Sequence, residues 1–328
     1  MPATTRRRLF AAPALLPGLA RAQGPAAEAF PSRPLTWVVP FAPGGITDTS
    51  SRVVAQRLGQ ILGQSVVVEN RPGAGGTIGA EAVARAPADG HTLLYGSQGP
   101  MAAAPALYPA LRYDPLRDFA PVQALGASPN LIICAPGKPW DSLAALVAAA
   151  RARPEGLTYG STGIGTAPHL AAELLQQVAG IRLVHAPYAN GAQAMNDAIG
   201  GRLDVFWDYP LTSIPHLRDG RLRALAVTDH QRVALAPEVP TVAEAGMPGA
   251  EMVAWAGIFV PVRTPAPVVA RLEAAMRLAL ADARVREFFD GTATLLWPEM
   301  GAVQFEAFLR AEVPRIGGLI ARAGARPG

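Results

Sequence analysis

The stretch Val39-Pro40-Phe41-Ala42-Pro43-Gly44-Gly45-Ile46-Thr47-Asp48 decides the fold of this chain. The apolar residues 37–39 predict a buried strand, the glycine pair predicts a sharp turn, and Thr47-Asp48 predicts the cap of a helix that runs to about residue 62. Glycines in such a turn let backbone N–H groups face outward, and the helix start adds partial positive charge. The turn is therefore predicted to attract an anion, which we interpret as a carboxylate.

The same strand, turn and helix pattern recurs further along the chain. Residues 65–86 predict a strand, a glycine turn and a helix, and residues 92–99 predict a strand that ends at Ser97 in a turn. The glycines at 73–79 suggest a dinucleotide site, but Ile78 takes the third glycine position of G-x-G-x-x-G, so a structural turn is favoured. These units predict a parallel sheet with a binding face at the ends of its strands.

A second domain is predicted after the apolar runs at 122–126 and 131–135, where the chain crosses over. Residues 157–179 repeat the opening arrangement of strand, glycine turn and helix, with Ser161, Thr162 and Thr166 in the turn. Two anion-accepting turns would then face each other across a cleft. The run 255–260 is predicted to return the chain to the first domain.

Composition favours a globular protein and argues against nucleic-acid binding. The chain has 328 residues, of which 50% are hydrophobic and 16% charged, enough to bury the cores of two domains. The formal charge of +4 comes from 29 basic and 25 acidic residues. Four of the basic residues lie in the first 22, and without them the chain is near neutral, with no basic run that contains aromatics.

Residues 1–22 have the pattern of a signal peptide. Arg6-Arg7-Arg8 forms a charged region, residues 9–20 are apolar, and Ala20-Arg21-Ala22 is a small-x-small cleavage site that would release Gln23. The arginine cluster leaves the export route open between the general and the twin-arginine pathway. No later stretch has the roughly 18 uncharged apolar residues of a transmembrane helix, so we expect the exported protein to be soluble.

Catalytic and metal-binding motifs are missing from the sequence. There is no G-x-S-x-G, no H-E-x-x-H and no P-loop, because the only lysine, Lys138, precedes a proline. Cys134 is the only cysteine, and the histidines show no metal spacing. We expect no catalytic residue, no metal and no cofactor. An enzyme whose residues lie far apart in sequence remains the alternative from another class.

Four stretches together resemble one known family. They are residues 41–48, Val67-Val68-Glu69-Asn70-Arg71-Pro72-Gly73-Ala74-Gly75-Gly76, residues 86–94 and Pro240-Thr241-Val242-Ala243-Glu244-Ala245-Gly246. The chain resembles the Bug family of periplasmic solute receptors, related to the binding component of tripartite tricarboxylate transporters, from about residue 31 to residue 323. The resemblance implies an α/β, two-lobed, type II Venus-flytrap fold in which each lobe is a mostly parallel sheet flanked by helices. The expected lobes are residues 32–127 with 255–328, and residues 128–254.

The resemblance also implies a function and a ligand site. It implies a monomeric receptor that captures a small carboxylated solute and delivers it to one large and one small membrane subunit; a ligand-sensing subunit for a membrane signalling protein is the alternative. The expected ligand-binding residues are Phe41, Ala42, Pro43, Gly44, Gly45, Ile46, Thr47, Asp48, Ser97, Ser161, Thr162, Gly163, Gly165, Thr166, His169, Tyr188 and Asp208.

Several of these residues have a structural interpretation as well. Asp48 is either a helix cap or a group that orients the turn, and Asp208 either accepts a ligand amine or hydroxyl or fixes a loop. His169, in the first turn of a helix, is expected to be a neutral structural donor. Tyr188 is expected more often in a core or cleft wall than in a specific ligand contact. The chain departs from many members at Pro187-Tyr188-Ala189-Asn190, where they have Pro-Tyr-Lys-Gly, and this leaves the identity of the carboxylate open.

Overall fold

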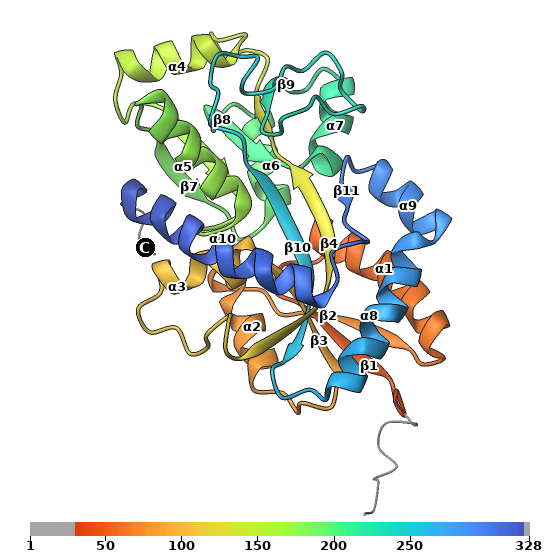
Figure 1. Cartoon of the computed structure of the whole chain (residues 1–328). Helices are drawn as coiled ribbons and strands as arrows, with labels where there is room; N and C mark the ends of the chain where they lie inside the picture. Colours follow the sequence, from red (N-terminus) through yellow and green to blue (C-terminus); the bar gives the residue numbers. More distant parts are fainter. Residues whose placement is uncertain (1–29, 325–328) are drawn as a thin grey trace, which may run out of the picture. The chain divides into compact units, whose positions relative to one another are not determined.

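The computed structural model describes residues 30–324 of the chain, which form two β-sheets surrounded by helices (Figure 1). The predicted signal peptide, residues 1–22, lies outside the described residues. Pro31 and the described residues after it belong to one compact unit. Within residues 30–324, no helix has the length and apolar character needed to cross a membrane.

The first sheet is built around the opening strand of the chain. Its order is β11 (Leu295–Leu296), β4 (Phe119–Pro129), β10 (Val253–Pro261), β3 (Thr92–Ser97), β1 (Leu35–Val39) and β2 (Val66–Asn70). β1 pairs in parallel with β2 and β3, whereas β10 is antiparallel to both β3 and β4.

The second sheet repeats this topology with other strands. Its order is β7 (Val184–Pro187), β6 (Thr158–Ser161), β8 (Val205–Asp208), β5 (Leu131–Cys134) and β9 (Arg223–Val227). β6 corresponds to β1 because each is the central parallel strand, and β8 corresponds to β3. β5 takes the place of β10, as the antiparallel strand next to the parallel three.

The two-sheet α/β fold is as predicted, but the sheets are mixed rather than mostly parallel. The strand–turn–helix units pair in parallel, as their crossover helices require. The strands that carry the chain between the sheets run the other way: β4 and β10 lie side by side as a long antiparallel pair (Figure 1). Their apolar sequences showed strands but gave no direction.

The helices cover the two sheets and pack on one another. Those of the first sheet are α1 (Ile46–Leu62), α2 (Thr77–Ala84), α3 (Ala104–Leu107), α8 (Ala266–Ala281), α9 (Ala283–Asp290) and α10 (Ala302–Ala323), with the short helices η1 (Ala74–Gly76) and η2 (Gly99–Ala103). Those of the second are α4 (Leu143–Ala152), α5 (Ala167–Ala179), α6 (Gly191–Ile199) and α7 (Pro210–Arg218). α1 packs against α8, and α10 packs against both β4 and α5.

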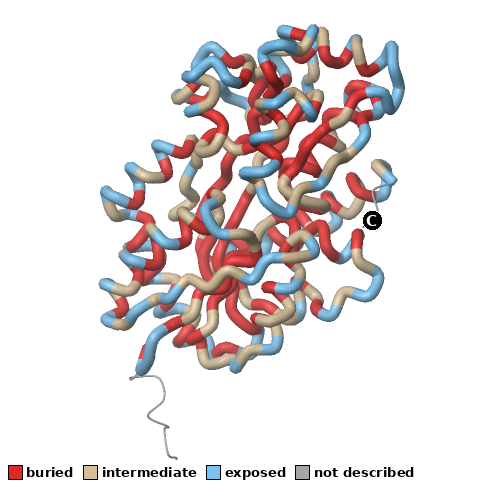
Figure 2. The backbone as a smooth tube through the Cα atoms, turned by 180° about the vertical axis from the view of Figure 1, so that it is seen from behind, coloured by how far each residue is buried: buried red, intermediate tan, exposed pale blue. Residues whose placement is uncertain are grey.

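The central strands form the buried cores. Figure 2 shows them mostly buried, while buried and exposed residues alternate along the outer helices. Trp37 on β1 and Trp207 on β8 are fully buried, one in each sheet. Burying a large side chain is worth roughly 1.5–3 kcal/mol, so these cores fix the strand ends on which the site is built.

Candidate functional site

A cavity of about 400 Å³ lies at the carboxyl ends of the parallel strands, between the two sheets. Residues that follow β1, β3, β6, β7 and β8 line it, together with residues of β4 and β10. Open α/β sheets bind ligands at this edge, because the turns there carry no ladder hydrogen bonds and vary freely. The cavity is therefore the candidate ligand site.

The structure brings eleven of the seventeen sequence-predicted site residues to this cavity and leaves six out of its lining. The eleven that line it are Phe41, Ala42, Pro43, Gly44, Gly45, Ile46, Thr47, Ser97, Thr162, Thr166 and Asp208. The six that do not are Asp48, Ser161, Gly163, Gly165, His169 and Tyr188.

The turn between β1 and α1 is held from behind by Asp48. Its Oδ2 accepts the N–H of Gly44 at 2.9 Å, and its Oδ1 lies 2.8 Å from the Arg52 guanidinium. Burial alone would raise the pKa of this carboxyl, but the hydrogen bonds from Arg52 and Gly44 hold it below its usual range. Asp48 is not the helix cap: Gly45 is, and Asp48 lies in the first turn, from which its short side chain folds back to the turn.

The first turn of α1 supplies the donors of the cavity. The N–H groups of a first helical turn have no partner inside the helix, and the N-cap, Gly45, has no side chain to accept them. Gly45, Ile46 and Thr47 all line the cavity. Gly44 has a φ of 86°, a conformation that glycine adopts freely, and this bends the chain so that the helix start faces the cavity.

The turn between β6 and α5 uses its N–H groups internally. Gly163 donates to Ser161 Oγ at 3.2 Å, Gly165 donates to His169 Nδ1 at 3.0 Å, and Thr166 donates to the Gly163 carbonyl at 3.3 Å. The prediction of two anion-accepting turns therefore needs correction for this one. It presents the side chains of Thr162 and Thr166 to the cavity instead.

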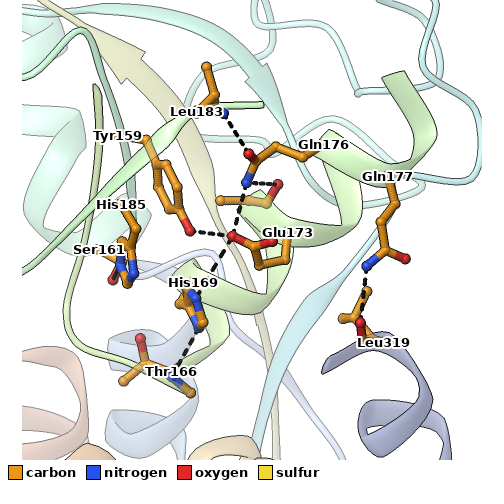
Figure 3. A network of polar contacts seen from close by, with 12 residues as sticks. Tyr159, Ser161, Thr166, His169, Glu173, Gln176, Gln177, Leu183, His185 and Leu319 are labelled. Atoms are coloured by element: carbon orange, nitrogen blue, oxygen red, sulfur yellow. Dashed lines mark hydrogen bonds and ion pairs between the residues drawn. The ribbon is translucent and has the colours of Figure 1, made fainter. Parts of the chain in front are cut away.

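Behind the second turn, three rings form a stack (Figure 3). His185 lies between Tyr159 and His169, with ring centroids 4.6 Å and 4.3 Å away. His185 Nε2 is 2.7 Å from Ser161 Oγ, and the Tyr159 hydroxyl donates to Glu173 Oε1 at 2.6 Å. The stack fixes both ends of the turn to β6, β7 and α5.

Both histidines in the stack are neutral near pH 7. Burial lowers the pKa of His169 to about 3, with a further contribution from His185, and burial lowers that of His185 to about 4. His169 Nδ1 accepts the N–H of Gly165, so the ring carries its proton on Nε2, 3.9 Å from Glu173 Oε1. The ring is an acceptor toward the turn, where the sequence predicted a donor.

Tyr188 also turns away from the cavity. Its hydroxyl donates to Asp197 Oδ2 at 2.8 Å, and Asp197 in turn pairs with Arg202. Its neighbours Ala189 and Asn190 line the cavity in its place, and Asn190 caps α6 by accepting the N–H of Ala192 at 2.9 Å. The departure from Pro-Tyr-Lys-Gly thus puts a neutral helix cap where many members carry Lys-Gly.

Asp208, at the end of β8, is the one carboxylate among the described residues that line the cavity. Its side chain is 4% exposed, and its Oδ2 accepts hydroxyls from Thr212 at 2.5 Å and Ser213 at 2.8 Å. Burial raises the pKa of this carboxyl to about 6, although these hydrogen bonds oppose the shift. At neutral pH it is a carboxylate with acceptor capacity left for a ligand.

The sequence did not single out many residues of the cavity wall. They include Ser50, Tyr95, Gln98, Leu125, Ser128, Asn190, Met195, Asn196, Tyr209, Thr212, His216, Trp255, Phe289 and Thr294. Asn190 belongs to the stretch in which the chain departs from many family members, and it lies between β7 and α6, as the other turns lie between a strand and a helix. Trp255 and Leu125 come from the crossing strands, whose register no local pattern reveals.

The glycines at 73–79 serve packing between turns. A Cβ at Gly75, whose φ is 64°, would lie 2.5 Å from the carbonyl oxygen of Ile164 in the second turn. This close approach explains the glycine without a nucleotide. Among residues 30–324, no group of three or more His, Cys, Asp or Glu side chains is placed to hold a metal ion.

Comparison with known proteins agrees with this architecture. Residues 50–325 match the TctC family, described as the tripartite tricarboxylate transporter family receptor. Protein BugT of Bordetella pertussis is 36% identical over 304 residues, which cover 92% of each chain.

Two solved structures of similar proteins contain a carboxylate ligand. MatC from Rhodopseudomonas palustris, with bound malate, is 35% identical and superposes with a TM-score of 0.83 over 89% of this chain and 100% of that one. The R. palustris protein Rpa4515, with adipate, is 34% identical, with a TM-score of 0.84 over 91% and 100%. The matching family is one of solute-binding receptors, not of enzymes. The chain therefore belongs to the TctC, or Bug, family of periplasmic solute-binding receptors of tripartite tricarboxylate transporters.

Proposed function

We propose that this protein captures a small carboxylated solute between its two sheets and delivers it to the large and small membrane subunits of a tripartite transporter. The proposal is supported by the start of α1, because Gly45, Ile46 and Thr47 line the cavity and the N–H groups of a first helical turn have no partner inside the helix. Donors of this kind, with the helix dipole behind them, bind carboxylates without an arginine or lysine. The malate and adipate bound by related receptors fit this chemistry.

Capture proceeds by closure of two lobes on the solute. We propose that the lobes are residues 32–127 with 255–328 and residues 128–254, joined by the crossings next to β4 and β10. A solute that touches both lobes favours the closed state only by its stronger binding to that state. The α1 turn of the first lobe holds the carboxylate, and the side chains of Thr162, Thr166 and Asp208 in the second lobe contact the rest of the solute. The receptor acts as a monomer and is exported by its signal peptide, residues 1–22.

The test is a thermal-shift screen of the protein without residues 1–22 against carboxylates, their amides and sugars. A ligand at about 100 times its dissociation constant adds roughly 3 kcal/mol of stability, which raises the melting temperature by several degrees. We expect shifts with carboxylates that vanish with the matching amides, without consumption of the ligand. Shifts with sugars or amides alone would contradict the proposal, and turnover of a compound would support an enzyme.

A further inference from the structure

The cavity wall has an unequal distribution of charge. Among the described residues that line it there is no lysine or arginine, and Asp208 is the one carboxylate. Burial and the nearby Arg221 lower the pKa of its one histidine, His216, which disfavours the charged form of the ring. The first sheet therefore offers an anion site of backbone N–H groups, whereas the second sheet offers a carboxylate.

The side-chain amide of Gln98 is a second polar group of the cavity wall that lacks a hydrogen-bond partner within residues 30–324. Gln98 follows β3 directly, is 1% exposed, and lines the cavity. Neither its amide nitrogen nor its amide oxygen has a hydrogen-bond partner among the described residues. Since a buried amide without partners is costly, a ligand group or a water molecule is expected to satisfy it. Gln98 adds one donor and one acceptor to the site but no positive charge.

The rest of the wall is largely apolar. The large apolar and aromatic side chains that line the cavity are Phe41, Ile46, Tyr95, Leu125, Met195, Trp255 and Phe289. All of them except Phe41 are nearly fully buried, so they give a fixed apolar surface. A solute with an aliphatic or aromatic body would cover this surface, which a short, highly charged acid would leave wet.

We propose that the solute of this receptor carries one carboxylate, an apolar body and a distal ammonium or hydroxyl donor that Asp208 accepts, rather than a second carboxylate. The inference rests on the proposed function, because it takes the α1 turn as the carboxylate site. A second carboxylate beside Asp208 would bring two like charges together in a buried place without a cation to balance them. A donor there completes the hydrogen bonding of Asp208, whose Oδ2 already accepts two hydroxyls.

Two series of ligands with a constant body test this inference by calorimetric titration at about pH 7.5. The aliphatic series is adipate, 6-aminohexanoate, 6-hydroxyhexanoate and hexanoate, and the aromatic series is terephthalate, 4-(aminomethyl)benzoate, 4-hydroxybenzoate and benzoate. In at least one series, a donor-bearing compound should bind at least about ten-fold more tightly than the dicarboxylate. Tighter binding of the dicarboxylate in both series would overturn the inference.

The variant Asp208→Asn isolates the charge of this side chain. The amide oxygen keeps the hydroxyl contacts of Thr212 and Ser213, so we expect a folded protein in which ammonium compounds bind about ten-fold more weakly and the dicarboxylate more tightly. The matched control is Asp219→Asn, which removes a charge at the end of α7, outside the cavity wall. An unchanged order of affinities in Asp208→Asn would overturn the inference.

Malate separates failure of this inference from failure of the proposed function. A protein that binds malate but none of the eight compounds keeps the carboxylate function and contradicts the distal donor. A protein that binds none of these carboxylates loses both proposals.

Discussion

The turns after β1 and β6 occupy equivalent places in their sheets, yet they present different chemistry. Both follow the central parallel strand, contain glycines and begin a helix. In the β1 turn a single N–H, that of Gly44, is tied to the side chain of Asp48, and the helix start stays open to the cavity. In the β6 turn the N–H groups of Gly163, Gly165 and Thr166 are all used by neighbouring groups.

The difference lies in what stands behind each turn. Asp48 is a negative acceptor that reaches only the outer edge of the β1 turn, and its charge is balanced by Arg52. Ser161 and His169 are neutral acceptors inside the β6 turn and take its donors. A glycine turn before a helix is therefore an anion site only if nearby side chains leave its N–H groups unused.

The largest expected effect on affinity follows from a charge placed in the β1 turn. Gly45 is the N-cap of α1, with φ −78° and ψ 176°, and nothing lies within 4 Å of a Cβ built there. Aspartate is a favoured N-cap, so Gly45→Asp should fold normally and gain a few tenths of a kcal/mol. Its charge repels a carboxylate at the same N–H groups, so carboxylate affinity should fall at least about 100-fold, or ~3 kcal/mol, in calorimetry.

Gly45→Asn is the matched control for this charge. It has the same size and the same capping ability without the charge. Loss of affinity common to both variants reports steric occupation of the turn, and the difference between them reports the charge. Equal affinities for a carboxylate in the two variants would contradict the anion site.

A smaller effect is expected from a substitution behind the β6 turn. Ser161→Ala removes the partner of both Gly163 N–H and His185 Nε2, and leaves buried polar groups unpaired. Chemical denaturation should show about 2 kcal/mol less stability. The affinity of the folded variant for a carboxylate should change less than three-fold, because Ser161 does not line the cavity. A large loss of affinity at unchanged stability would instead make Ser161 a ligand contact.

The stack of rings behind the β6 turn predicts a dependence of stability on pH. Since the pKa of His185 is lowered to about 4 from 6.5, only the unfolded state binds its proton between these values. Its contribution is complete above pH 6.5 and is lost as pH falls toward 4, at about 1.4 kcal/mol per pH unit. His169 acts in the same direction. Asp208 opposes them, because its raised pKa lets the folded state bind a proton between about 4 and 6.

Measurement of unfolding free energy between about pH 6 and 4 checks this balance. His185→Gln should reduce the slope of unfolding free energy against pH by the equivalent of about one proton. Asp208→Asn should increase this slope by the equivalent of about one proton. Identical slopes in the wild type and both variants would mean that neither group titrates as its burial requires.

The contrast between the turns also shows what sequence could and could not reveal. The β1 turn was found because its strand, its glycines and its helix start are contiguous, and the same local pattern located β6 and its turn. Asp208 was expected from the family resemblance. α7 was missed because Pro210 and Pro215 weaken the helical pattern, so Thr212 and His216 were missed with it. Trp255 and Leu125 reach the cavity through the antiparallel register of β10 and β4, a property of the whole fold.

The smallest expected effect on affinity distinguishes the two hydroxyls of the β6 turn, those of Ser161 and Thr162. Thr162 lines the cavity, and its hydroxyl makes one long contact, 3.4 Å to Thr166 Oγ1, whereas the Ser161 hydroxyl is committed to the stack. Thr162→Val keeps the shape of the side chain and removes one hydrogen bond to the solute, so affinity should fall about five-fold, or ~1 kcal/mol, at nearly constant melting temperature. If Thr162→Val lowers stability as much as Ser161→Ala does, both hydroxyls of the β6 turn have a structural role and neither contacts the solute. The second sheet would then contact the solute mainly through Asp208 and the helix starts around it.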